Sequence, residues 1–444
     1  MPEALFGLVE REVSRRGGGQ AELYVVRERA RRYDARGGGI DSVSFADSVA
    51  LGIRVFRNGR MGFSYGFGES ADEIARMVET ALFCADASDP DPSYGLPGAG
   101  GDFPEPALYD AAWESVGDPD KAAFAAGLER KVLAFDPRMK RVRSASLRET
   151  VTEVSFRNSA GSDGVCRASE YVAYVESVAE QGGEGQTGHG FGFGRRFSDL
   201  SAEAIAEEAG RKAVRMLGAR GLPTGRYAAV LENGAAAELL EVLVPSFLAS
   251  HVAKGKSMLA GKRGMTIASP RVGISDDPLD ARGSGAQAFD GEGSPCRRND
   301  LVEGGVLKGY LADTFWGRKL GTGTTASCRR PSPKAPPAVG ISNLFIAPGE
   351  TPQEELLRQA GAGVLLTEFL GLHTADPISG DFSVGAAGIR FERGERKEPV
   401  RGFAVSGNIL SLLHQVNGVG SDFRWFGNVG SPSLAIPEIA VGGE

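Results

Sequence analysis

The sequence predicts an α+β fold, with two N-terminal α+β subdomains followed by a β-rich C-terminal domain that contains one long helix. The chain has 444 residues, more than the roughly 250–300 residues that a single core holds. Its 63 glycines favour turns and hairpins over a helical bundle. Runs of strand patterns beside single amphipathic helices are typical of α+β layers and not of a parallel βαβ array.

The first predicted subdomain spans residues 1–95. Its expected elements are a helix over 3–15, a strand over 21–26, a hairpin over 43–66 and a helix over 70–87. Asn58-Gly59 accepts the positive φ angles of the hairpin turn. Ser70 is the expected N-cap of the last helix, and Glu73 completes a capping box. The proline- and glycine-rich run 88–107 then breaks the pattern.

The second predicted subdomain spans residues 107–220. Asp118-Pro119 begins a helix, because proline is tolerated in a first turn. The elements expected after it are strands over 140–147, 149–158 and 165–179, a glycine-rich loop over 182–194 and a helix over 201–217. The run 218–225, which contains Pro223, is the expected boundary with the last domain.

The third predicted domain spans residues 223–444. Its one long helix is expected over 235–254, after a turn at Asn233-Gly234, and residues 321–337 are expected to form a long surface loop. The other expected elements are strands over 227–231, 342–347, 364–370 and 434–441, helices over 352–361 and 408–415, a hairpin around Gly304-Gly305, and a hairpin of 382–391 with 399–405. Short strands thus dominate this domain.

The charge balance argues against a nucleic-acid binder. The formal net charge is -7 and the sequence pI is about 5.5, whereas nucleic-acid binding requires a basic excess. The arginine-rich run Arg27 to Arg36 is diluted by Glu28 and Asp34, so we interpret it as a solvated face or a strand edge. No GxxxxGK[ST] phosphate loop occurs.

Cysteine usage and the N-terminus indicate a reducing cytoplasm. Cys84, Cys166, Cys296 and Cys328 form no CxxC pair. The first residues lack the basic and apolar regions of a signal peptide, and no apolar run approaches the roughly 18 residues of a membrane span. We therefore expect a cytoplasmic protein with no membrane contact.

The histidines do not form a helical zinc motif. A zinc peptidase needs two imidazoles on one helix face, a third ligand and a carboxylate that activates water. The four histidines lie at least thirty residues apart, and none is followed by glutamate. His251, on the long helix, follows the apolar residues Phe247 and Leu248, so we interpret it as a surface or helix-end histidine.

Two other histidines lie in glycine-rich or polar segments. His189 lies in the glycine-rich run 182–194 and could contact a ligand, although a mobile loop is the simpler interpretation. His373 precedes Asp376, Ser379 and Asp381. These residues could form a Ser-His-Asp set, but nearness in sequence does not define a triad. The favoured alternative is a polar turn in which Asp and Ser side chains cap backbone amides.

Several segments together resemble the TldD/PmbA family, a family of cytoplasmic bacterial metalloprotease subunits that has also been associated with DNA gyrase. The segments are residues 42–66, 230–257, 289–321, 371–388, 405–423 and 431–443. They extend over nearly the whole chain in order. GDFSVGAAG, with the later SGN and SPSL, is similar to the PmbA/TldE branch. The resemblance implies the three-part α+β architecture expected above.

In the TldD branch, a helix carries HExxxH and a cysteine near the C-terminus completes the zinc site. The resemblance sets that motif against Ser246 to His251, with Ser246 at the first histidine position and Phe247 at the glutamate position. Only His251 matches, and no cysteine lies between Asp422 and Ser431. These degenerate positions imply a chain with no catalytic residue, metal or cofactor of its own, so its status as an enzyme stays open.

The resemblance implies a non-catalytic subunit of a zinc metalloprotease. Its partner would be a TldD-like subunit that carries the zinc, with a homodimer as the alternative for the chain alone. The substrates would be unstructured peptides or modified peptide precursors, and the peptide- or partner-contacting residues would come from His189, His373, Asp376 and Asp381. Two alternatives stay open: a protein-binding modulator of another enzyme such as DNA gyrase, and a stand-alone peptidase with a site around His373.

Overall fold

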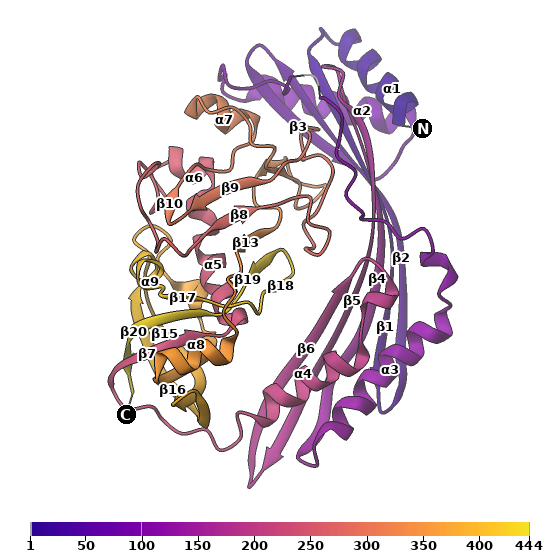
Figure 1. Ribbon diagram of the computed structural model, residues 1–444. Helices are drawn as coiled ribbons and strands as arrows, with labels where there is room; N and C mark the ends of the chain where they lie inside the picture. The colour runs from indigo at the N-terminus through magenta and orange to yellow at the C-terminus, as the bar shows by residue number, and fades with distance from the viewer. Residues whose placement is uncertain (1, 99, 444) are drawn as a thin grey trace.

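The computed structural model describes residues 2–98 and 100–443, which form an α+β protein. A long curved N-terminal sheet lies beside a C-terminal domain built from two further sheets (Figure 1). The sheet and its helices come from the first half of the chain, and both C-terminal sheets come from the second. Within the described ranges, no helix is long and apolar enough to cross a membrane.

The N-terminal sheet is antiparallel and has the strand order β3-β2-β1-β4-β5-β6. Its strands are β1 (Gln20–Arg36), β2 (Gly39–Arg57), β3 (Arg60–Gly66), β4 (Met139–Asn158), β5 (Asp163–Gln181) and β6 (Glu184–Gly194). The predicted 43–66 hairpin is confirmed as β2 and β3, and Asn58 has the expected positive φ of 53°. The two strands predicted over 140–158 are instead one continuous strand, β4.

The sheet passes through both predicted N-terminal subdomains, because β1 pairs with β2 on one side and with β4 on the other. Arg27 to Arg36 therefore lies in a central strand, and the prediction of a strand edge is wrong. The run's charges still reach solvent, since Arg29, Arg32 and Arg36 are exposed. Whether 1–95 and 107–220 fold separately stays a prediction.

Helices cover this sheet in two separate pairs, toward its two ends (Figure 1). They are α1 (Pro2–Arg15) with α2 (Ala71–Ala87), and α3 (Asp118–Phe135) with α4 (Ala202–Val214). Each pair closes its own apolar core, one around Leu51 and Val78 and the other around Leu147 and Ala209. All four helices were predicted, and Ser70 Oγ accepts the Glu73 N–H at 3.3 Å as expected of an N-cap. Two short 3₁₀ turns span Trp113–Ser115 and Phe197–Asp199.

The glycine-rich run 182–194 is a strand, β6, and the prediction of a mobile loop is wrong. Its glycines let α4 lie directly on the strand. A Cβ added at Gly188 would lie 2.2 Å from the Ala209 carbonyl oxygen, and one at Gly190 would lie 2.1 Å from the Ile205 carbonyl oxygen. Both glycines therefore serve close backbone approach in a strand, a contact that only the folded chain reveals.

The C-terminal domain contains two six-stranded sheets. One has the order β16-β15-β14-β7-β20-β17 and consists of β7 (Gly225–Leu231), β14 (Ala362–Leu370), β15 (Asp381–Glu392), β16 (Glu395–Asn408), β17 (Gly418–Val419) and β20 (Leu434–Gly442). The other has the order β10-β9-β8-β13-β19-β18 and consists of β8 (Ile274–Asp276), β9 (Asn299–Glu303), β10 (Val306–Leu307), β13 (Leu344–Ile346), β18 (Arg424–Phe426) and β19 (Val429–Ser431). The domain is thus β-rich, as predicted.

Smaller elements complete this domain: α7 (Thr314–Leu320), α8 (Gln353–Ala360), α9 (Ile409–Gln415), a 3₁₀ turn at Leu372–Thr374, and the short pair β11 (Cys328–Arg329) with β12 (Ala338–Val339). The predicted surface loop 321–337 is partly buried, because Ala326, Ser327 and Cys328 are at most 3% exposed. The short helix predicted over 352–361 is confirmed as α8, but its N-cap is Pro352 and no side chain caps it.

The helix predicted over 235–254 is broken into α5 (Asn233–Phe247) and α6 (Ala249–Ala253). Leu248 between them is extended, with φ -84° and ψ 124°. Two backbone hydrogen bonds fix the break: Leu311 N–H donates to the Phe247 carbonyl and Ala249 N–H donates to the Leu311 carbonyl, both at 2.9 Å. The predicted Asn233-Gly234 turn is instead the first turn of α5, which lies between the two C-terminal sheets.

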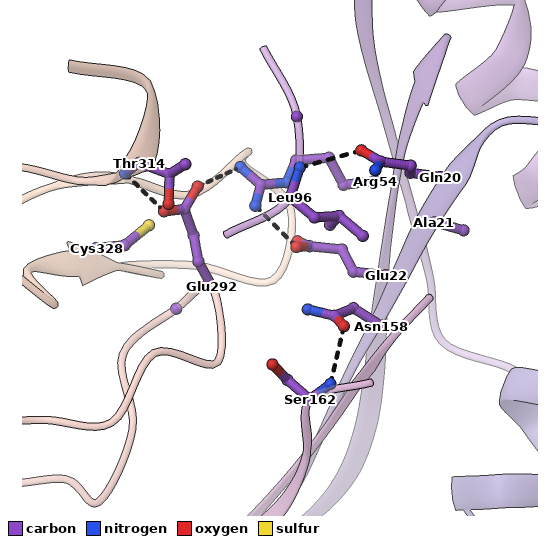
Figure 2. Close-up of polar contacts among 12 residues, drawn as sticks. Gln20, Ala21, Glu22, Arg54, Leu96, Asn158, Ser162, Glu292, Thr314 and Cys328 are labelled. Carbon is purple, nitrogen blue, oxygen red and sulfur yellow. Dashed lines mark hydrogen bonds and ion pairs between the residues drawn. The ribbon is translucent and has the colours of Figure 1, made fainter. Parts of the chain in front are cut away.

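A buried ion network joins the N-terminal sheet to the C-terminal domain. Arg54 on β2 donates to Glu22 on β1 at 2.7 Å and to Glu292 of the C-terminal domain at 2.9 Å (Figure 2). Arg330 of the C-terminal domain also pairs with Glu22. The second oxygen of Glu292 accepts the Thr314 N–H at 2.9 Å. Glu22, Arg54 and Glu292 are at most 5% exposed, so these charges depend on one another.

Arg54→Met is expected to lower the free energy of unfolding by about 3–5 kcal/mol, because it leaves Glu292 as a buried anion without its cation. Denaturant titration followed by circular dichroism measures the loss. Arg143→Met is the matched control, since Arg143 lies on the same sheet in an exposed pair with Glu176, and such pairs contribute at most about 1 kcal/mol. Equal losses in the two variants would contradict a special role for the network.

Candidate functional site

Two neighbouring cavities lie along the exposed face of α5. The larger one, about 690 Å³, lies between β6 with α4 on one side and the C-terminal domain on the other. The second, about 560 Å³, lies between α5 and the turn that contains His373. Glu238 and Glu241 of α5 line both cavities. We call the larger cavity the β6 cleft and the smaller one the His373 cavity.

Each lysine and arginine that lines the β6 cleft forms an ion pair with a carboxylate of the same chain. Arg424 of β18 makes a two-pronged contact with Glu208 of α4, at 2.7 and 2.8 Å. Arg215 makes a similar contact with Glu232, at 2.8 Å for both nitrogens. Lys212 lies 2.7 Å from Glu208. Bidentate arginine–carboxylate pairs are strong and directional, so they fix α4 against the C-terminal domain across the cleft.

The carboxylates on α5 have no such partners. Among the described residues, no lysine, arginine or histidine forms an ion pair with Glu238, Glu241 or the neighbouring Glu368. Burial raises the pKa of Glu238 to about 7, and the charges of Glu368 and Glu241 add to that shift, whereas the Phe369 N–H that donates to its carboxylate and the charge of Lys212 oppose it. Burial also raises the pKa of Glu241. Raised carboxyl pKa values beside a cavity are typical of functional sites.

The structure separates the residues at the degenerate zinc-motif positions. Ser246 and Phe247 lie in the last turn of α5 and are 0% exposed. His251 lies in α6, beyond the break at Leu248. The three positions therefore lie on two helices and not on one continuous helix. Ser246 Oγ points into the core, where it has no hydrogen-bond partner among the described residues.

The surroundings of His251 do not fit a metal ion. Its Nδ1 lies 3.3 Å from Ser250 Oγ, and a hydroxyl is not one of the usual zinc ligands. Burial lowers the pKa of His251, and the cations Lys254 and Lys256 lower it further; the same cations would repel a divalent metal. Within residues 2–98 and 100–443, no three His, Cys, Asp or Glu side chains gather closely enough to hold a metal ion.

The other segment that carries a zinc ligand in the TldD branch lies against α5. β18 and β19, which fall between Asp422 and Ser431, pack on this helix. The fold thus brings together the two segments that the resemblance links to zinc. Here they present Phe423, Trp425 and Phe426 in place of a cysteine. The four cysteine thiols are free and lie on other elements.

The turn around His373 is a capped polar turn, as favoured from the sequence. Asp376 Oδ1 accepts the N–H groups of Ile378 and Ser379, at 2.7 and 3.2 Å, and these bonds lower the Asp376 pKa. Ser379 Oγ accepts the Asp381 N–H at 3.2 Å. His373 is exposed and lines the His373 cavity. None of the hydrogen bonds found among the described residues joins it to Asp376, Ser379 or Asp381, so these side chains are not assembled as a triad.

His189 lies on β6 and lines the β6 cleft. Its Nε2 lies 3.5 Å from Lys212 Nζ. Burial lowers the pKa of His189, and the charge of Lys212 lowers it further. Of the four residues expected to contact a peptide or a partner, His189 and His373 therefore line neighbouring cavities, whereas Asp376 and Asp381 shape the turn.

The sequence analysis missed Glu238 and Glu241. They lie three residues apart, so they share one face of α5, on a helix whose other faces are apolar. Two carboxylates on one side of an otherwise apolar helix are the sequence signal for this site, and it is independent of the histidine and cysteine patterns.

Comparison with known proteins places the chain among PmbA/TldD proteins. Family models described as PmbA/TldA metallopeptidase domain 1, central domain and C-terminal domain match residues 21–85, 112–217 and 224–443. The Metalloprotease PmbA of Escherichia coli O157:H7 is 29% identical, over 96% of this chain and 92% of that protein. A protein of Methanothermobacter thermautotrophicus named Metalloprotease is 31% identical, over 90% of this chain and 88% of that protein.

Solved structures agree with this assignment. A Thermotoga maritima protein, described as a candidate modulator of a DNA gyrase, superposes with a TM-score of 0.91 at 25% identity, over 99% of this chain and 100% of that one. TldE from Thermococcus kodakarensis has the same fold, with a TM-score of 0.89 at 23% identity, over 99% of both chains.

Glu238→Gln is expected to stabilise the protein at pH 8 by on the order of 1 kcal/mol, after allowance for solvent screening, and to change little at pH 5. The folded-state pKa of about 7 lies above the ordinary 4.5. The folded chain therefore holds a proton that the unfolded chain releases, and stability falls as the pH rises between these values. Thermal melting at the two pH values measures the difference.

Glu203→Gln is the control for this prediction. Glu203 is exposed on α4, and its hydrogen bond with Lys131 lowers its pKa. This shift is opposite in direction to that of Glu238. This variant is expected to gain no stability at pH 8. If the Glu238→Gln variant is no more stable than the parent at pH 8, the ionised Glu238 carboxylate does not destabilise the folded chain.

Proposed function

The chain belongs to the PmbA/TldD metallopeptidase family, and on that premise we propose that it is the non-catalytic, PmbA/TldE-type subunit of a zinc metalloprotease. A TldD-type partner supplies the zinc and the water-activating carboxylate. The present chain forms a heterodimer with that partner and shapes the chamber that receives the peptide. The substrates are unstructured peptides or modified peptide precursors that the complex trims.

The observation that carries this proposal is the burial of Ser246 and Phe247. At the positions where the TldD branch has a histidine and a glutamate, these side chains are 0% exposed and face the core. Neither a serine hydroxyl nor a phenylalanine ring is a usual zinc ligand or water-activating group. The remaining histidine, His251, has Lys254 and Lys256 as its charged neighbours. The residues present therefore support a subunit that leaves zinc chemistry to another chain.

The compartment is part of the same proposal. All four cysteine thiols are free, and Cys296 and Cys328 are buried. Free thiols are usual in a reducing compartment. The proposal therefore includes a cytoplasmic location, where such a complex would meet newly made or partly degraded peptide chains.

The purified chain is expected to hold no stoichiometric zinc and to cleave fluorescein-labelled casein only after it is mixed with a TldD-type subunit. Metal analysis and the increase in fluorescence measure these two properties. Removing metal with a chelator should abolish activity of the mixture, because the zinc of the partner is required. Stoichiometric zinc and full activity in the present chain alone would overturn the proposal.

Two variants separate the alternatives. His251→Ala is expected to leave the activity of the mixture unchanged, since His251 takes no part in the proposed zinc chemistry. His373→Ala tests a stand-alone peptidase, which would require activity of the single chain that this variant abolishes. The gyrase role described for the Thermotoga relative would be favoured instead if the chain captured purified DNA gyrase without a TldD-type subunit and had no effect on proteolysis.

A further inference from the structure

β6 is an edge strand whose open side lines the β6 cleft. It pairs with β5 on one side only, and in the lower half of the view it is the edge of the long sheet that lies toward the C-terminal domain (Figure 1). Gly185, Thr187 and His189 line the cleft and are exposed. Edge strands in natural proteins are usually blocked by charges, prolines or bulges. Here the open edge faces the β6 cleft.

The turn between β5 and β6 identifies the backbone groups that point into the cleft. Gly182 and Gly183 both have positive φ and form a two-residue turn, and Gln181 lies opposite Glu184. In such a hairpin the pair flanking the turn is hydrogen-bonded, and the bonding alternates along the ladder. The N–H and C=O groups of Gly185, Thr187 and His189 therefore point away from β5.

A side-chain contact supports this alternation. Phe191 follows His189 by two residues, so its carbonyl is also expected to point away from β5. That carbonyl accepts a hydrogen bond from Arg424 Nη2 of the C-terminal domain, at 3.1 Å. The outward groups of Gly185, Thr187 and His189 make no such contact among the described residues. Three consecutive outward-facing residues thus offer N–H and C=O groups to a chain that lies beside them. They span five positions of β6, about 14 Å from the first to the last at the rise of a strand.

Three carboxylates at the cleft have no ion-pair partner among the described residues. Arg215 pairs with Glu232, Lys212 and Arg424 share Glu208, and Arg211 pairs with Glu207. Glu238, Glu241 and Glu368 line the same cleft and form no ion pair within the described part of the chain. An occupant that hydrogen-bonds to β6 and carries a positive charge would satisfy both the open edge and these carboxylates.

We propose that the β6 cleft binds a peptide segment of about five residues in extended conformation, added as a strand to β6, with a lysine or arginine side chain directed to Glu238, Glu241 and Glu368. Backbone hydrogen bonds give such strand addition its affinity, and side-chain pockets give it specificity. The inference deepens the proposed function, because a subunit that shapes a peptide chamber has to hold peptide. It adds a site on the N-terminal sheet and a preference for a cationic residue.

Fluorescence anisotropy of labelled peptides on the purified full chain tests the site. The probe is the amidated peptide Thr-Val-Thr-Lys-Thr-Val-Thr with an N-terminal fluorescein. One comparison peptide has glutamate in place of lysine, and another has alternate backbone amides N-methylated, which removes donors and keeps the charge. Both comparison peptides are expected to bind at least about tenfold more weakly than the probe.

Variants of the chain locate the binding. Glu238→Gln with Glu241→Gln should weaken probe binding about tenfold. The matched control, Glu10→Gln with Glu105→Gln, removes two exposed carboxylates outside the cleft and should have no effect. Thr187→Pro removes one outward N–H and should abolish binding without changing the melting temperature, since proline is tolerated on the open side of an edge strand.

Three results would overturn the site: equal binding of the N-methylated peptide, no effect of the double glutamine variant, or a Thr187→Pro chain that binds normally. Loss of a homodimer in Thr187→Pro, with no peptide binding by the parent, would assign the edge to a second copy instead. Peptide binding uses this chain alone, so it is independent of zinc. If the mixture is active but the chain binds no peptide, the result contradicts this inference only. If the chain binds the peptide but the mixture is inactive, the result contradicts only the proposed function.

Discussion

The arrangement of the molecule depends on one buried arginine. Arg54 lies between Glu22 of its own sheet and Glu292 of the C-terminal domain, and Arg330 reaches back to Glu22. Charges removed from water require close, well-oriented partners, so this end of the sheet has one docking position on the C-terminal domain. The contacts of Arg424 and Arg215 hold the other end. The sheet is thus fixed at both ends, and cavities remain along the span between them.

The β6 cleft departs from what folding alone would favour. An open strand edge, three carboxylates without an ion-pair partner among the described residues and a carboxyl pKa raised to about 7 all lie together at one interface. The cations that line this cleft are paired, in contrast to these three carboxylates. Local departures of this kind are expected where a protein binds something else. The fold supports them because the ion pairs across the cleft hold both walls in place.

The site was only partly accessible to sequence reasoning. The capping role of Asp376 and Ser379 followed from local chemistry, because each side chain bonds an amide within three residues. The loss of zinc ligands was visible as Ser246 and Phe247 at the motif positions, but the break at Leu248 was not, because it depends on Leu311, more than sixty residues away. His189 was assigned to a loop, since glycine content does not distinguish a mobile segment from a strand under a helix.

Local patterns along the chain were sufficient to predict the secondary structure of the periodic segments, the three-part α+β class and the family. Amphipathic stripes, capping residues and turn dipeptides act over a few residues, so they can be recognised in the sequence without knowledge of the fold. The tertiary structure decided that β1 and β4 join two predicted subdomains in one sheet, that β6 is a strand, and that Glu238 and Glu241 face a cleft. Each of these depends on contacts between residues distant in the chain, where burial and backbone pairing outweigh local propensity.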